Sequence, residues 1–322
     1  MTRYARQMQL PEIGEAGQAR LSNARVAVIG AGGLGCPVLQ YLAGAGVGQI
    51  EIFDPDRVEE SNLHRQPIYR MADLGRPKAT VARDTLRALN PQITVEAYVE
   101  ALGPGKAPAL AAAADLVIDA ADSFAVSYIL SDACLAAGTP LISASVLGQT
   151  GYIGAFCGRA PSLRAVFPEL PGTGATCATA GVLGPVVGVI GALQAQIALR
   201  ILLDTTPSSE GRMVTADLTN LHFGGFSFLN SAEPDTATPF IATHMVQGSD
   251  LILDLRDRHE APDKITTRAK RVTMADLPSI TPSPDQRVVL CCQSGLRAWQ
   301  AANVLHARGI GHLALMAAKA CA

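Results

Sequence analysis

The sequence predicts an α/β fold: a doubly wound, mostly parallel sheet with antiparallel additions, followed by a small second α/β unit. Apolar strand-like runs alternate with helix-like runs over residues 25–143, as in a parallel sheet covered by helices on both faces. The first strand-like run breaks into a glycine-rich loop at 30–35 and then into a helix. A new strand–loop–helix pattern begins at residue 248. Together these observations predict two α/β domains.

The elements are expected in regular order along the chain. Residues 1–20 predict an amphipathic helix or arm. The expected strands are 25–30, 49–54, 93–98, 115–119 and 140–143, and the expected helices are 35–46, 77–89, 106–113, 125–137 and 184–203. From residue 144 the pattern changes, and the runs 151–158 and 162–167 predict added antiparallel strands. The stretch 169–181, rich in glycine and threonine, predicts a mobile loop.

Composition bounds the kind of protein. With 322 residues, 48% of them hydrophobic and 17% charged, the chain can bury a sizeable core in each of two domains. We expect the first domain over 1–230, a linker over 231–247 and the second domain over 248–322. The net charge of −2 gives no support for a nucleic-acid or membrane partner. The longest uncharged apolar stretch, 178–199, contains glycines, a proline and glutamines, and predicts a buried helix.

The cysteine spacing and the N-terminal sequence both favour a location in the cytoplasm. Seven cysteines are present, and no two of them have C-x-x-C spacing. This argues against a disulfide framework and against a structural zinc site. The N-terminal segment is polar and charged, unlike a secretory signal. We therefore expect a cytoplasmic protein with reduced thiols.

The glycine loop predicts a nucleotide site in a Rossmann-like turn. Gly30 permits a tight turn, Gly32 lets the backbone approach a phosphate, and Gly35 lets the following helix pack on the strand. The helix N-terminus offers free N–H groups to an anion. Asp54 ends the second strand, nineteen residues beyond Gly35, where an acidic side chain would meet ribose hydroxyls. This pattern alone predicts only a nucleotide, of which NAD is the usual one.

The residues that follow favour ATP over NAD. Transfer of the α-phosphate of a triphosphate needs cations to stabilise charge on the leaving pyrophosphate, and Arg65 and Lys78 would supply them. Ser61 and Asn62 could hydrogen-bond phosphate or metal-bound water. Asp122 follows a buried strand at the edge of the sheet where ligands bind, and its carboxylate suits Mg²⁺. The sequence therefore predicts a site for ATP and Mg²⁺.

The motifs in this order resemble the ubiquitin-activating-type adenylyltransferases of bacteria, the ThiF, MoeB and HesA family. The resemblance covers residues 3–230 and rests on RYARQ, GAGGLG, DPDRVEESNLHRQ, GRPK, ALNP and DAADSF. It implies that the nucleotide-binding set is Gly30, Gly32, Gly33, Gly35, Asp54, Ser61, Asn62, Leu63, His64, Arg65, Lys78, Asp122 and Ser123. It also implies a homodimer in which Arg6 reaches into the neighbouring subunit's site.

The resemblance implies a substrate and leaves alternatives open. The substrate would be the C-terminal glycine of a small ubiquitin-like sulfur carrier protein ending in Gly-Gly, activated as an acyl-adenylate for thiocarboxylate formation. The 179–195 stretch favours a ThiF-type enzyme of thiamine biosynthesis. A MoeB-type enzyme of molybdenum-cofactor biosynthesis is the alternative. Lower-ranked alternatives are an NAD(P)-dependent oxidoreductase and a non-catalytic module that only docks a carrier.

The chain departs from the family pattern in two places. The family has asparagine where this sequence has Ser123, a shorter side chain that would weaken one contact. The family also has two C-x-x-C pairs that bind zinc. Here Ser162 and Ala165 stand at the first pair and no second pair exists, so zinc is not expected and packing alone would hold this region.

Two cysteines are candidates for chemistry. Cys177 lies in the 169–181 loop, and in the resembling proteins a cysteine there can become linked to the carrier; the alternative is an inert buried thiol. Cys292 begins a C-x-x-G-x-R pattern after an apolar strand. The loop's N–H groups, the helix dipole and Arg297 would lower the thiol pKa and stabilise a persulfide, while Gly295 relieves the backbone.

The 248–322 segment resembles a rhodanese-like sulfurtransferase domain. The resemblance rests on CQSGLR and on the strand LILDLR. It implies a persulfide on Cys292, with a cysteine desulfurase as a candidate sulfur donor. The segment lacks the family's Gly-His and its closing glycines, so an inactive rhodanese-like module is the alternative.

Overall fold

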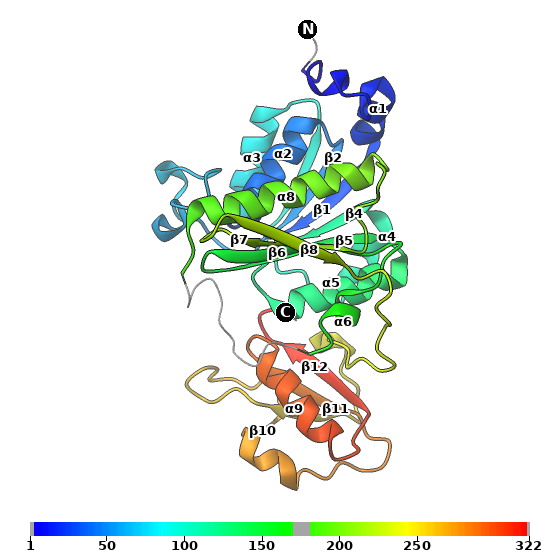
Figure 1. Ribbon diagram of the computed structural model, residues 1–322. Coiled ribbons are helices and arrows are strands. Elements are labelled where there is room, and N and C mark those ends of the chain that lie inside the picture. The colour runs from blue at the N-terminus through cyan, green and yellow to red at the C-terminus, as the bar shows by residue number, and fades with distance from the viewer. Residues whose placement is uncertain (1–2, 170–180, 321–322) are drawn as a thin grey trace.

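An eight-stranded sheet forms the centre of the first part of the chain (Figure 1). The computed structural model describes residues 3–169 and 181–320. The strands are β1 (Arg25–Ile29), β2 (Gln49–Phe53), β3 (Thr94–Tyr98), β4 (Leu116–Asp119), β5 (Pro140–Leu147), β6 (Thr150–Cys157), β7 (Arg212–Asp217) and β8 (His222–Ser227). Their order is β3-β2-β1-β4-β5-β6-β7-β8, parallel as far as β5 and antiparallel from there on. The fold class expected from the sequence is confirmed.

Helices cover both faces of this sheet. They are α1 (Gly14–Asn23), α2 (Gly35–Ala45), α3 (Lys78–Leu89), α4 (Ala107–Ala113), α5 (Phe124–Ala137), α6 (Leu163–Val166) and α8 (Gly184–Leu202). One buried apolar cluster joins the sheet to α2, α3 and α8, and another joins its opposite face to α4 and α5 (Figure 1). The central parallel strands β1 and β4 are buried because both faces are covered, which is why they are nearly continuous apolar runs in the sequence, whereas the edge strand β3 alternates.

One expectation for the antiparallel part needs correction, and another lies outside the described residues. The run 162–167 is not a strand, because the Ser162 Oγ accepts a hydrogen bond from the Ala165 N–H (3.3 Å) and caps the short helix α6. The strands that extend the sheet beyond β6 are instead β7 and β8. The loop expected over 169–181 falls almost entirely outside the described residues.

A four-stranded parallel sheet forms the centre of the small second unit. Its strands are β9 (Leu251–Asp254), β10 (Lys270–Arg271), β11 (Val288–Cys292) and β12 (Leu313–Ala317), in the order β10-β9-β11-β12, with α9 (Leu296–His306) packed on β11 and β12. The segment before it joins the sheet edge, because the N–H of Leu315 donates to Pro239 O and Leu315 O accepts from Ile241 N–H, both at 2.8 Å. The apolar core of this unit continues into the cluster beneath α5.

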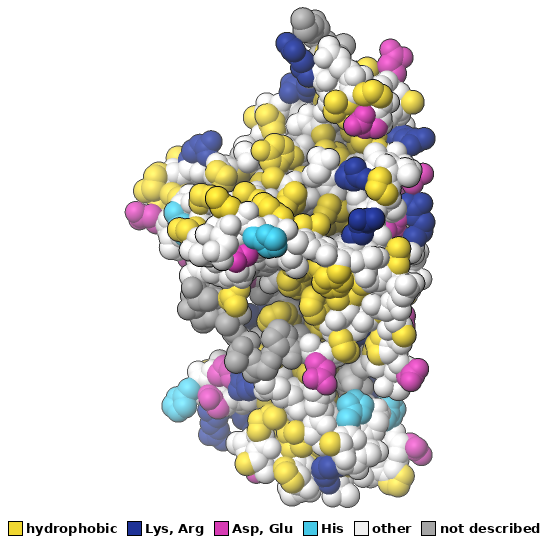
Figure 2. Space-filling view, viewed as in Figure 1, with side chains coloured by type: hydrophobic (Ala, Val, Ile, Leu, Met, Phe, Trp, Pro, Cys, Tyr) yellow, Lys and Arg dark blue, Asp and Glu magenta, His cyan; other side chains and the backbone are white. Residues whose placement is uncertain are grey.

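Helix α8 is the longest apolar element. Among the described residues it is the one helix long and apolar enough to cross a membrane, judged by length and composition alone. Its inner face packs on α2, β5 and β6, and its Gln194 Nε2 donates to Asp119 O, at the end of β4, at 2.8 Å. Figure 2 shows hydrophobic side chains gathered along its outer face.

Candidate active site

The glycine loop between β1 and α2 is shaped by contacts that no side chain could share. Gly30 has φ +101°, and a Cβ on it would lie 2.6 Å from Ala120 O. A Cβ on Gly35 would lie 2.0 Å from Gly30 O. A Cβ on Gly32 would meet only Gln66 Nε2, at 3.8 Å. Gly30 and Gly35 are therefore required for packing, whereas the space above Gly32 is open to a ligand, as a phosphate-binding loop requires.

The loop is held in place from the neighbouring strand. The buried Asp54 carboxylate accepts hydrogen bonds from Ala31 N–H (2.7 Å) and Asp56 N–H (2.8 Å). The Tyr69 hydroxyl donates to Ala31 O at 2.7 Å. Burial raises the pKa of Asp54 above its ordinary value, although these N–H donors oppose that rise. In this structure Asp54 thus orients the loop, in addition to any contact it makes with a ribose.

Lys78 lies at the first residue of α3, directly after Pro77. Its side chain is 8% exposed, and the Nζ lies 3.0 Å from Asp56 Oδ2. The Asp56 side chain is 66% exposed. A phosphate group, which carries more negative charge, can therefore replace the Asp56 carboxylate as the partner of Lys78 while that carboxylate rotates into the solvent. A buried ammonium attracts an anion more strongly than an exposed one does, because less water screens the two charges. Lys78 is therefore suited to bind a phosphate group.

The segment 59–66 brings Arg65 to the same loop. The buried Asn62 Oδ1 accepts from Glu59 N–H (3.4 Å), and its Nδ2 donates to Ser61 Oγ (3.3 Å), so both side chains fold this segment. The Arg65 Nη1 donates to Ser61 O at 3.0 Å. Arg65 makes no ion pair with any carboxylate in the described part of the chain. Its charge is therefore available to an anion.

Three more residues of the predicted set flank this segment. Leu63 is half-buried and packs against the cluster beneath α8. The exposed His64 shares a 2.8 Å contact between its Nε2 and the Arg65 Nη1. A Cβ on Gly33 would lie 3.2 Å from Val187 Cγ2, so Gly33 fits the loop against α8.

The end of β4 places two carboxylates at this edge of the sheet. Ala120 contacts the position of Gly30, so Asp122, two residues further on and exposed, lies beside the glycine loop. Ser123 is the N-cap residue of α5. Asp119 is fully buried and accepts from Ser143 Oγ (2.7 Å) and Ala121 N–H (3.2 Å). Burial raises the pKa of Asp119 to about 6.

Asp119 was not among the residues predicted from the sequence. Its position at the end of an apolar run, three residues before Asp122, is the signal that could have found it. Its two acceptor contacts fix the turn that carries Asp122, so it shapes the site without facing a ligand.

Arg6 lies far from this site in its own chain. It belongs to an N-terminal arm in which the Tyr4 hydroxyl accepts from Asn90 Nδ2 (2.8 Å) and the Gln7 Nε2 donates to Ala45 O (2.8 Å). Ala45 is the last residue of α2 and the glycine loop is at its start. Eleven helical residues span about 16 Å, so Arg6 is not positioned to serve the site of its own chain.

Cys292 occupies a second candidate site, at the end of β11. Its Sγ accepts from the N–H groups of Gly295 (3.1 Å) and Ala298 (3.4 Å). Gly295 has φ +92°, which lets the loop curl around the sulfur. The Arg297 Nη1 donates to Leu255 O at 2.8 Å, and its other terminal nitrogen pairs with Glu260. Cys177, the other predicted reactive cysteine, lies outside the described residues.

The region that holds zinc in the resembling family is held here by hydrogen bonds. The expectation that packing alone secures it is wrong. The Glu233 carboxylate accepts from the Ser162 N–H (2.6 Å) and the Ser162 Oγ (2.5 Å), and Arg164 pairs with Asp132 (2.6 Å). The described residues contain no cluster of three or more His, Cys, Asp or Glu side chains suited to a metal. Ser162 and Ala165, which stand at the positions of that family's first C-x-x-C pair, supply no thiolate for zinc.

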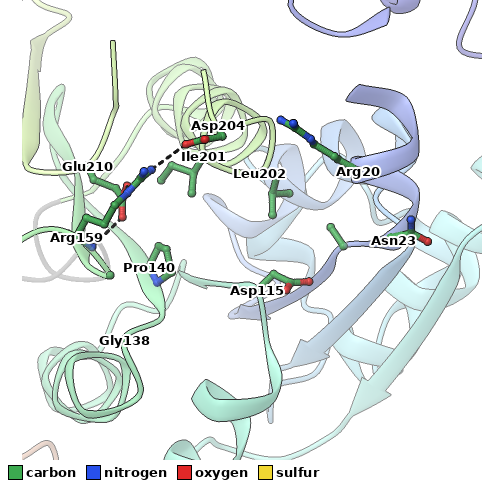
Figure 3. Close-up of a pocket in the computed structure, with 12 residues that line it drawn as sticks. Arg20, Asn23, Asp115, Gly138, Pro140, Arg159, Ile201, Leu202, Asp204 and Glu210 are labelled. Atoms are coloured by element: carbon green, nitrogen blue, oxygen red, sulfur yellow. Dashed lines mark hydrogen bonds and ion pairs between the residues drawn. The ribbon is translucent and has the colours of Figure 1, made fainter. Parts of the chain in front are cut away.

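A cavity of about 650 Å³ lies at the opposite edge of the main sheet, away from the glycine loop (Figure 3). Arg20, Asp115 and Pro140 are among the residues that line it. Its Arg159 is neutralised by Glu210 (2.6 Å) and Asp204 (3.1 Å). Its Arg20 donates to Leu203 O (3.0 Å) and its Asp115 accepts from Arg25 N–H (2.8 Å), so these charged side chains also have partners.

The fold and the glycine-loop edge define a nucleotide-binding α/β protein. The chain belongs to the ThiF family, whose family model matches residues 4–240. It is 43% identical over 231 residues to the sulfur carrier protein adenylyltransferase of Thermus thermophilus, covering 69% of this chain and 85% of that protein. It is 40% identical over 225 residues to the SAMP-activating enzyme E1 of Haloferax volcanii, covering 69% and 83%.

Two further comparisons each cover about two thirds of the chain. The bovine adenylyltransferase and sulfurtransferase MOCS3 is 45% identical over 218 residues, which is 67% of this chain and 48% of that protein. The chain thus matches about half the length of MOCS3. The crystal structure of E. coli MccB with MccA-N7isoASN superposes with a TM-score of 0.63 at 23% identity, over 70% of this chain and 71% of that one. This last likeness shows the fold alone.

Proposed function

We propose that this protein is an ATP-dependent adenylyltransferase that activates the C-terminal glycine of a small ubiquitin-like sulfur carrier ending in Gly-Gly. The observation that carries the proposal is the buried Lys78 ammonium together with Arg65, which has no ion pair among the described residues and directly precedes Gln66, the side chain nearest the open Gly32. A dinucleotide needs no such pair of cations, because a helix N-terminus largely neutralises its pyrophosphate. The names of the relatives in Thermus and Haloferax support the same reaction class.

Each group has a distinct task in the reaction. An oxygen of the carrier's carboxylate attacks the α-phosphorus of ATP, and the bond from that phosphorus to the pyrophosphate oxygen breaks. Lys78 and Arg65 stabilise the negative charge on the departing pyrophosphate. The Asp122 carboxylate would hold Mg²⁺, which neutralises phosphate charge when bound. Asp54 keeps the loop N–H groups in place.

We propose that Arg6 completes the site of a neighbouring copy in a homodimer. The arm that carries Arg6 packs at the far end of α2, so its guanidinium cannot serve its own site. A closed twofold dimer lets each arm serve the other subunit. We also propose a cytoplasmic location, because the part of the chain that the structure describes contains no disulfide.

The small unit is proposed to be a rhodanese-like sulfurtransferase. Its support is the curled loop whose N–H groups point at the Cys292 sulfur. In this reaction the Cys292 thiolate attacks the outer sulfur of a persulfide, with a cysteine desulfurase as the candidate donor, and the donor leaves as a thiolate. The carrier thiocarboxylate would serve thiamine biosynthesis, with molybdenum-cofactor biosynthesis as the alternative.

The test is ATP–pyrophosphate exchange by the purified chain with a panel of carriers ending in Gly-Gly. We expect exchange that depends on one carrier and that falls by about 100-fold or more in Lys78→Met. Lys106→Met is the matched control, because the Lys106 side chain is 62% exposed and pairs only with Glu100 on the surface. NADH binding without ATP turnover would favour the oxidoreductase. Carrier binding without exchange would favour the docking module.

A further inference from the structure

The loop that carries Cys292 lies against α5 of the first part of the chain, which we call the adenylation unit (residues 3–230). The Cys292 side chain has no exposed surface. A Cβ on Gly295, within this loop, would lie 3.1 Å from the Ala125 Cβ and 2.9 Å from the Phe240 ring. Ala125 is in the first turn of α5, three residues after Asp122. The start of α5 therefore contacts the nucleotide edge on one side and the Cys292 loop on the other.

Three side chains hold the small unit in this position, and we name them the aromatic seat: Tyr128, Arg164 and Trp299. The rings of Tyr128 and Trp299 lie 5.2 Å apart at 52°. The Arg164 Cζ lies 4.9 Å from the Tyr128 ring centre and 5.3 Å from that of Trp299. Asp132 fixes the Arg164 guanidinium through two hydrogen bonds of 2.6 and 2.8 Å. Tyr128 and Arg164 belong to the adenylation unit and Trp299 to the small unit.

No hydrogen bond from its indole nitrogen holds Trp299 in the seat. Within the described part of the chain, the buried Trp299 Nε1 has no hydrogen-bond partner. Stacking and cation–π contacts of this kind are each modest. Apolar side chains of the two units also pack together around the seat. A substitution of Trp299 therefore weakens the ring contacts of this interface without removing a hydrogen bond.

A thiol without exposed surface cannot be reached by a sulfur donor or by a carrier. We propose that the seated arrangement is a closed resting state in which α5 caps Cys292, and that the small unit must leave the aromatic seat before Cys292 can react. This inference rests on the proposed sulfurtransferase function for its purpose. Its physical content, an occluded thiol released by opening of the seat, is independent of that function.

The test is the alkylation rate of Cys292 in the full chain, measured with iodoacetamide and peptide mass spectrometry. Trp299→Ala removes the stacked ring, and we expect Cys292 to react about tenfold faster than in the wild type. Trp299→Phe keeps a ring and loses no hydrogen bond, so we expect the wild-type rate. ATP–pyrophosphate exchange is expected to be unchanged in both, because Trp299 lies outside the nucleotide site.

Neighbouring thiols report unfolding. Cys291 is buried in the same strand as Cys292, and Cys134 is buried in α5. We expect both to remain unreactive in Trp299→Ala. Ala125→Phe opens the cap from the opposite side, and Ala136→Phe, on the exposed part of the same helix, is its matched control.

Two results would overturn the cap. One is a wild-type Cys292 that reacts as fast as a free thiol in solution. The other is a Cys292 rate that rises only together with Cys291 in both opening variants, which would show unfolding of β11 rather than release. A third result would separate the two proposals. If the wild-type chain transfers no sulfur from thiosulfate to cyanide while the alkylation rates are as expected, the proposed sulfurtransferase function is refuted and the capping of Cys292 is not.

Discussion

Replacement of Asp119 by asparagine is expected to change how stability depends on pH. Asp119 is fully buried at the end of β4, where its side chain accepts from Ser143 and Ala121. Burial raises its pKa from 3.8 to about 6. Between these two values the folded protein keeps the Asp119 proton while the unfolded chain has lost it.

The sign and the size of the effect follow from this difference. The stabilisation due to Asp119 is fully present below pH 3.8 and is lost as the pH rises through about 6. A shift of about two pH units corresponds to about 3 kcal/mol in the free energy of unfolding. About 2 kcal/mol of this falls between pH 4.5 and 7.5, where measurements are practical. The asparagine of Asp119→Asn does not titrate, so the variant lacks this pH-dependent contribution to the free energy of unfolding.

The assay is urea unfolding of both proteins at matched ionic strength across pH 4.5–7.5. The free energy of unfolding of the wild type minus that of Asp119→Asn should fall by about 2 kcal/mol over this range. Taking the difference cancels the other titrating groups. A difference that stays constant, or that rises with pH, would refute the assignment of Asp119 as a carboxyl group whose charged form is disfavoured by burial.

Two further predictions concern the linker contact and the dimer. Glu233→Gln is expected to lower the free energy of unfolding by about 1–3 kcal/mol, because it weakens both hydrogen bonds to Ser162; urea unfolding measures this, and EDTA should leave both proteins unchanged. Arg6→Ala is expected to lose exchange. An equimolar mixture with Asp122→Ala should recover about a quarter of wild-type exchange, since half of the random dimers carry one intact site. No recovery would contradict supply of Arg6 across the dimer.

The parallel part of the fold was predictable because its signals are local. The strands β1, β2 and β4 are largely apolar runs, each followed by a helix in the sheet's regular alternation, so neighbouring residues suffice to identify them. The antiparallel part was harder. At 162–167 one capping serine decides for a short helix over a strand. All six residues of β8 are exposed, so this strand lacks the alternation of buried and exposed side chains that marks a strand in a sequence.

The candidate site was predictable as far as it depends on the edge of the sheet. Strands that run parallel end at one edge, so Gly32, Lys78 and Asp122 could be expected to lie together. The task of Asp54 in holding the loop, and the burial of Asp119, depend on which groups meet across the sheet. The partnership of Ser162 with Glu233 joins residues 71 positions apart, and no local pattern encodes it.

The short segment 162–164 contacts both the linker and the small unit. Ser162 ties the linker to the adenylation unit through Glu233, and Arg164 carries the aromatic seat on which the small unit rests. Arg164 also donates to Thr238 O in the linker, at 3.3 Å. A zinc site would fix this segment rigidly, whereas hydrogen bonds and ring contacts can break and re-form. Hydrogen bonds and ring contacts in place of a zinc site therefore agree with the proposal that the small unit leaves the aromatic seat and returns to it.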